Sequence, residues 1–102
     1  MSIILASSGN SRVDARFGDA LLASVDKWIA EGATAIVLEL GPQAVIDFAG
    51  ARALGMASKR LGRGRLRVTG LGARSRTLLR SLGLSEDIAL FEWWTEAVAQ
   101  AA

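Results

Sequence analysis

The sequence predicts an α/β fold with a mixed or mostly parallel sheet, and two observations lead to this. Short β-branched and apolar runs alternate along the chain with stretches whose apolar residues recur at helical spacing. Turn signals rich in glycine and serine separate the two kinds of segment. The 102 residues match the size of one domain and 51% are hydrophobic, enough for a core, so we expect residues 1–102 to form a single domain.

The first third of the chain predicts a strand, a short extended segment and a helix. Residues 2–7 (SIILAS) are a β-branched run that ends in the turn signal SSGN, and residues 11–15 continue briefly as a strand edge. From Ala15 the apolar residues recur at helical spacing. Asp14 is placed to cap this helix and Gly32 to end it.

The middle of the chain predicts a central strand followed by a helix of small residues. Residues 34–41 (TAIVLELG) form an apolar run suited to a strand that is covered on both faces. After the break at residues 41–42 the segment AVID is extended, and Asp47 is placed to cap a helix over 48–62. Gly50 and Gly55 each cost this helix roughly 1 kcal/mol relative to alanine, so we expect close packing to require them.

The last third continues the alternation. Residues 65–69 predict a strand between glycine turns, and residues 73–83 predict a compact helix that ends at Gly83. In this helix we expect leucines 78, 79 and 82 to lie inside and arginines 74, 76 and 80 to lie outside. Residues 88–92 predict a last short strand, and residues 93–102 predict a final helix.

Charge is divided unevenly along the chain. Nine basic residues and no acid lie between Arg52 and Arg80, whereas the first 51 residues carry six acids and three bases. Such a segment can form a surface for nucleic acid or an acidic partner. Because the bases are dispersed and few aromatic residues lie among them, ordinary solvated helix faces are the favoured interpretation, and nucleic-acid binding is ranked last.

The composition argues against several kinds of chemistry. The chain has no cysteine and no histidine, which excludes disulfides, Cys/His zinc sites and imidazole acid–base catalysis. No phosphate-binding loop and no close pair of carboxylates is present, so an enzyme is disfavoured and we expect no metal and no cofactor. No apolar run reaches the roughly 20 residues that span a bilayer, so we expect a soluble cytoplasmic protein without direct membrane insertion.

Four stretches, taken in order, resemble the STAS domain, the fold of bacterial anti-sigma factor antagonists. SRVDARFGDALLA resembles that family's G-x-L-D start of the first helix, and AIVLELGPQAVIDFAGARAL resembles its strand, loop and D-S-S-G-L-x-x-L signature. RLRVTGLGARSRTLLRSLGL and LFEWWTEAVAQA resemble the strands and helices that follow. The resemblance implies a four- to five-stranded mixed sheet with about four helices.

The resemblance also implies a function in partner switching. In typical members the serine before the motif glycine is phosphorylated by an anti-sigma factor that has a histidine-kinase-like ATPase fold, and phosphorylation breaks the complex. The family's D-S-S-G is Asp47-Phe48-Ala49-Gly50 in this chain, so Ala49 stands where relatives carry that serine. Alanine has no hydroxyl, and Ser58 lies about three turns into the helix, too far to replace it. We therefore expect binding at this turn without the phosphorylation switch.

The predicted partner-binding residues surround the start of the helix that follows Asp47. For Phe48 two positions remain open: packing in the core under the turn, or exposure as an anchor of an interface. Gly50 is expected to serve close packing more than contact with a ligand. The side of the helix away from its stripe of small residues is either an ordinary solvated face or a docking surface that faces acids on a partner. The full predicted set is Asp47, Phe48, Ala49, Gly50, Arg52, Met56, Lys59 and Arg60.

Three functions remain open from the sequence. The first is an anti-sigma factor antagonist-like module that binds a kinase-type ATPase or a related signalling partner. The second is a subunit bound to the nucleotide-binding component of a lipid-transport ABC system, and the third is nucleic-acid binding. Trp93 and Trp94 also allow a weak homodimer contact, although packing accounts more simply for at least one of them.

Overall fold

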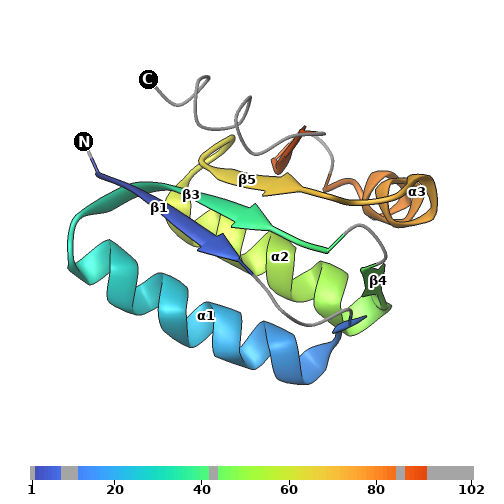
Figure 1. The fold of residues 1–102 in the computed structure, drawn as a ribbon, viewed down its shortest axis with the longest axis horizontal. Coiled ribbons are helices and arrows are strands. Elements are labelled where there is room, and N and C mark those ends of the chain that lie inside the picture. The colour runs from blue at the N-terminus through green and yellow to red at the C-terminus, as the bar shows by residue number, and fades with distance from the viewer. Residues whose placement is uncertain (1, 8–11, 42–43, 85–86, 92–102) are drawn as a thin grey trace.

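The computed structural model describes residues 2–7, 12–41, 44–84 and 87–91. Strands and helices alternate along this part of the chain (Figure 1). The predicted helix over 93–102, which holds Trp93 and Trp94, lies outside the described residues. The elements are β1 (Ser2–Ser7), β2 (Arg12–Val13), α1 (Ala15–Ala30), β3 (Ala33–Glu39), β4 (Val45–Ile46), α2 (Phe48–Leu61), β5 (Leu66–Thr69), α3 (Ala73–Ser81) and β6 (Ala89–Phe91).

The strands form a four-stranded sheet in the order β1-β3-β5-β6 and a two-stranded sheet of β2 and β4. Every pair in the described residues is parallel, so the sheet that the sequence left as mixed or mostly parallel is parallel throughout this part. Parallel neighbours need a crossover connection, and here α1, α2 and α3 each lie between consecutive strands of the larger sheet.

Helices α1 and α2 lie side by side on one face of the larger sheet (Figure 1). The strand order advances in one direction, and right-handed crossovers then place successive helices on the same side. The two helices touch at Gly18 and Ala53, where a Cβ atom added to Gly18 would lie 2.5 Å from the Ala53 Cβ. Small residues on this seam therefore let the helices approach closely.

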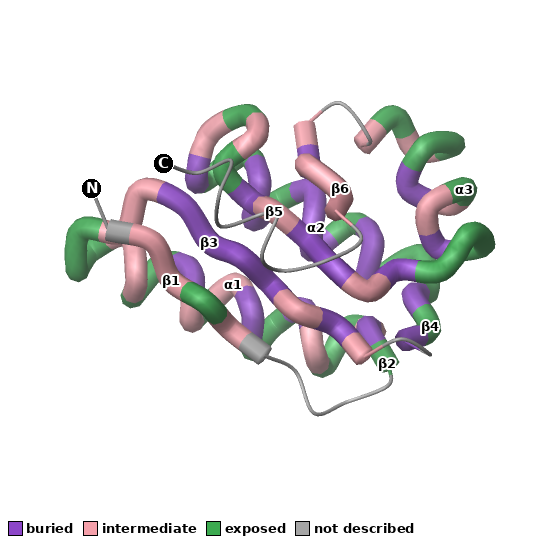
Figure 2. The backbone as a smooth tube through the Cα atoms, turned by 45° about the horizontal axis from the view of Figure 1, so that its top comes forward, coloured by how far each residue is buried: buried purple, intermediate pink, exposed green. Residues whose placement is uncertain are grey.

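The core lies between the sheet and these two helices. On β3 the side chains of Ile36 and Leu38 belong to this core, and Leu40 joins it just past the strand end. The alternate residues Ala35 and Val37 are also buried, at 5% and 0% exposure, which confirms that β3 is a central strand with both faces covered. Figure 2 shows this strand buried along most of its length.

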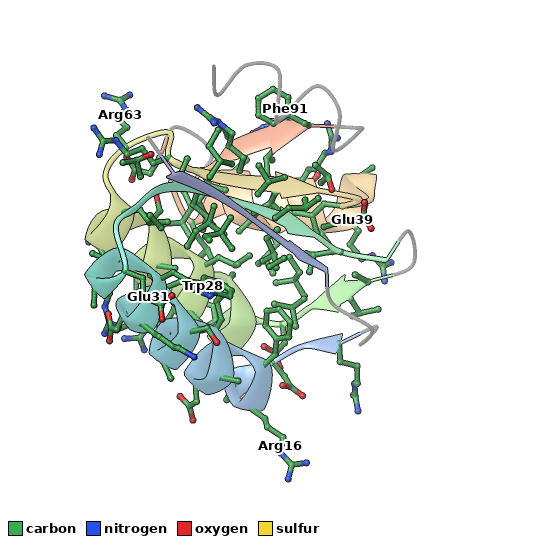
Figure 3. The ribbon with its side chains drawn as sticks, turned by 60° about the vertical axis from the view of Figure 1, so that its left-hand side comes forward. Arg16, Trp28, Glu31, Glu39, Arg63 and Phe91 are labelled. Atoms are coloured by element: carbon green, nitrogen blue, oxygen red, sulfur yellow. The ribbon has the colours of Figure 1, made fainter. Side chains whose placement is uncertain are left out.

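The predicted ends of α1 are confirmed. The Asp14 carboxylate accepts a hydrogen bond of 3.0 Å from the backbone N–H of Phe17, which satisfies one of the free donors at the helix start. At the other end Gly32 has a φ of 99°, a conformation that favours glycine. Between them Trp28 packs against the core from the inner side of the helix (Figure 3).

Helix α3 follows β5 and shows the predicted division of its leucines and arginines, with one exception. Leu79 is buried, while Leu78 and Leu82 are half-buried against the core. Arg76 is half-buried instead of fully outside, because its Nε donates a 3.2 Å hydrogen bond to the Leu71 carbonyl before the helix begins. No helix in the described part of the chain combines the length and apolar character needed to cross a membrane.

Candidate functional site

The site begins at Asp47, which caps α2. Its backbone is extended, with φ −96° and ψ 179°, and its Oδ1 accepts a 2.8 Å hydrogen bond from the Gly50 N–H. The Asp47 carbonyl then accepts the first helical bond, from Ala51 at 2.9 Å. The predicted capping role of Asp47 is thus confirmed, and a cap of this kind contributes about 0.5–2 kcal/mol.

A two-stranded parallel sheet supports the start of the helix. Val13 of β2 pairs with Ile46 of β4, and both side chains are buried. The pairing extends one step further, because the Asp47 N–H donates to the Val13 carbonyl at 3.2 Å. The first turn of α2 is therefore fixed to β2 on one side and to its own cap on the other.

Gly50 lies beneath this turn and does not reach the surface. It is buried, and a Cβ atom added to it would overlap the Val13 carbonyl oxygen. The expectation of close packing is confirmed. Gly50 belongs to the predicted partner-binding set, but as a buried residue it acts on the site through packing, by letting the helix lie against β2.

Phe48 and Ala49 occupy the exposed tip of α2. Phe48 is 58% exposed and Ala49 is exposed. Of the two positions that the sequence left open for Phe48, exposure is therefore correct and core packing is wrong. The exposure of Phe48 follows from its place on the helix. Phe48 and Ala49 lie on the side of the first turn opposite Gly50 and Ala51, and both of the latter are buried.

The exposed face of α2 continues from this tip. Arg52 and Lys59 are exposed, and the Met56 side chain is 44% exposed. Residues 48, 52 and 56 follow at intervals of four, which places them on one face of the helix. The buried stripe of small residues that the sequence predicted faces the core, so the structure brings the predicted outer residues together.

Arg60 differs from its neighbours on this helix. Its Nη1 donates to Asp26 Oδ2 of α1 at 2.8 Å, and the two side chains are 36% and 61% exposed. This ion pair holds Arg60 over the seam between the helices. Among the described residues, Arg60 is thus the one cation of the predicted set that already has an ion-pair partner within the chain.

The nearby hydroxyl groups are buried or hydrogen-bonded within the protein. Ser58 is buried and its Oγ donates a 2.8 Å bond to the Asp87 carbonyl. On α3, Ser75 is buried and the Thr77 Oγ1 donates to the Ala73 carbonyl at 2.9 Å. None of these three side chains lies at the tip of α2, where Ala49 presents a methyl group.

Val45 is an exposed apolar residue that the sequence argument missed. It is 63% exposed, although its neighbours Ala44 and Ile46 are buried. The signal was present in the segment AVID, because alternation along an extended segment turns every second side chain outward.

The described residues hold no group of three or more histidine, cysteine, aspartate or glutamate side chains arranged to bind a metal ion. What this corner of the molecule offers is a rigid turn with apolar and basic side chains on its outer surface. Such a surface suits contact with another macromolecule.

Comparison with known proteins identifies one family. A family model described as STAS domain matches residues 9–101, which is most of the chain. The match includes β2, β4 and α2, the elements that build the site. No curated protein sequence matches the chain.

Proposed function

Because the chain belongs to the STAS domain family, we propose that it is an interaction module like the anti-sigma factor antagonists, and that it binds a histidine-kinase-like ATPase or a related signalling partner without a serine switch. STAS domains mediate contacts between proteins and are generally non-catalytic. The family also includes transport-associated modules.

The exposure of the α2 tip carries this proposal. Phe48 at 58% and Met56 at 44% are two of the large hydrophobic side chains that the described surface leaves in solvent, and both lie on the outer face of α2. Aromatic residues and methionine are enriched in the centres of protein interfaces. The turn that fixes Phe48 is held by a cap and by β2, so little conformational freedom is lost on binding.

The missing switch follows from Ala49. The family's switch esterifies a serine oxygen, and Ala49, the exposed residue at that position, has only a methyl group. The helix start would favour an added phosphate, because its free N–H groups and dipole attract anions. The substitution of alanine therefore removes the acceptor from a position that is otherwise suited to modification.

Titration calorimetry with the purified ATPase-type anti-sigma factor of the source organism tests the proposal. Phe48→Asp and Met56→Glu should each weaken binding by about 2 kcal/mol, roughly 30-fold, because each buries a charge in the centre of the contact. Lys27→Glu is the matched control, since Lys27 is exposed on α1 and lies outside this surface. Equal binding by all four proteins would contradict the proposal.

A second candidate is a subunit bound to the nucleotide-binding component of a lipid-transport ABC system. The observation that favours it is again the methyl group of Ala49, because a permanent subunit has no need of a phosphorylated residue. The same titration distinguishes the two: tight binding to the transporter component, with no binding to the anti-sigma factor, supports the second candidate.

A further inference from the structure

The surface around α2 extends onto the two-stranded sheet through Arg12 and Val45. These residues are direct partners in the parallel register of β2 and β4. Both are exposed, while the next pair, Val13 and Ile46, is buried. Arg12 and Val45 therefore lie next to each other on the outer face of this sheet, at the usual strand separation of roughly 4.8 Å.

This pair is continuous with the tip of the helix. Val45 precedes Phe48 by three residues, so their Cα atoms lie at most about 11 Å apart. Along the helix each step of four residues advances roughly 6 Å, from Phe48 to Arg52 and on to Met56. We call the resulting set the α2 surface: Arg12, Val45, Phe48, Arg52, Met56 and Lys59.

The charges on the α2 surface are unbalanced. Arg12, Arg52 and Lys59 make no ion pair within the described part of the chain. Two acids lie beside this surface: Asp26 pairs with Arg60, and Asp47 accepts the Gly50 N–H but keeps its negative charge. The surface therefore combines three exposed apolar side chains with three cations that have no ion-pair partner among the described residues, against the single negative charge of Asp47.

We propose that the α2 surface, including Arg12 and Val45, docks a protein whose contact region is an apolar recess bordered by carboxylates. This rests on the proposed function and specifies the chemistry of its partner. Val45, Phe48 and Met56 enter the recess, and the three cations meet the acids at its rim. An apolar centre with a charged rim is the arrangement of protein interfaces, whereas a nucleic acid would offer phosphates to the cations and nothing to Val45.

Association kinetics with the same ATPase-type protein test this inference at low (about 50 mM) and high (about 500 mM) salt. Arg12→Glu should slow association about tenfold at low salt and much less at high salt, because a rim charge acts through steering. Val45→Asp should raise the dissociation rate, and Val45→Ser repeats the test with a milder change. Arg16→Glu is the control: Arg16 is exposed and projects away from the sheet at the start of α1 (Figure 3).

The outcomes separate this inference from the proposed function. If Met56→Glu abolishes binding while the Arg12 and Val45 variants bind like the unmodified chain, the proposed function stands and the extension onto β2 and β4 is wrong. If the chain binds no ATPase-type protein, both are overturned. Binding of a random-sequence DNA duplex that depends on Arg12 and Lys59 but not on Val45 or Phe48, or a dimer that Val45→Asp dissociates, would also overturn the inference.

Discussion

Gly50 packs against the carbonyl group of Val13 so closely that no side chain fits between them. This contact joins the first turn of α2 to β2, and the Asp47 N–H bond to the same carbonyl strengthens the connection. The tip of the helix is thereby held in a fixed position with Phe48 and Ala49 facing solvent. The motif glycine acts through packing, and Phe48 and Ala49 before it form the exposed tip that we propose as the contact surface.

Gly50→Ala should destabilise the protein. The added methyl group would overlap the Val13 carbonyl, and a backbone group cannot rotate away as a side chain can. We therefore expect the free energy of unfolding to fall by at least about 1–3 kcal/mol. Urea denaturation measures it. Gly41→Ala is the control, because a Cβ atom there meets nothing within 4 Å; if both variants lose the same stability, the close packing at Gly50 is refuted.

Asp47→Ala should lower the free energy of unfolding by about 0.5–2 kcal/mol, because the Gly50 N–H loses its 2.8 Å acceptor. Asp47→Asn keeps an oxygen in the same place and should retain most of the stability. Thermal denaturation of the two variants checks this. A loss as large in the asparagine variant as in the alanine variant would show that the cap is not the source of the effect.

The Arg60–Asp26 ion pair should contribute little to stability. Both side chains are substantially exposed, so a double-mutant cycle with Arg60→Ala and Asp26→Ala should give a coupling of about 0.2–1 kcal/mol that shrinks in high salt. Because Arg60 is already neutralised, Arg60→Ala should also weaken partner binding less than Arg52→Ala. The opposite order of the two binding losses would be inconsistent with the charge argument.

Ser58→Ala should cost about 1 kcal/mol of unfolding free energy, the net value of one hydrogen bond. The loss stays modest because the Asp87 carbonyl keeps a second donor, the Gly64 N–H at 2.9 Å. Ser81→Ala serves as the comparison: Ser81 is exposed, and its bond to the Leu78 carbonyl is local. Chemical denaturation should therefore separate the two variants, and a Ser81 effect equal to that of Ser58 would contradict this assignment.

Local chemistry allowed much of the fold to be predicted from the sequence. The caps at Asp14 and Asp47 and the stop at Gly32 are each determined by a few neighbouring residues. The buried run of β3 was evident because it is apolar on both faces. The parallel direction of each strand pair could not be predicted from neighbouring residues, because it depends on how strands that are distant in sequence pair in the sheet.

The candidate site was predictable in part. The turn at residues 47–50 and the outer residues of α2 followed from the motif and the helical period. The exposure of Phe48 did not, because an aromatic residue at a helix start fits either the core or an interface, and the packing of Gly50 on β2 decides between them. The pairing of Arg12 with Val45 joins residues 33 positions apart, a relation that no local pattern contains.

The most direct test of the central claim uses intact mass spectrometry after incubation with the ATPase-type partner and Mg-ATP. The unmodified chain should keep its mass and stay bound, because neither Phe48 nor Ala49 at the exposed α2 tip has a side-chain oxygen to accept a phosphoryl group. Ala49→Ser should gain about 80 Da and dissociate, since it places a hydroxyl at the same exposed position. A gain of about 80 Da by the unmodified chain, accompanied by release of the partner, would contradict the account.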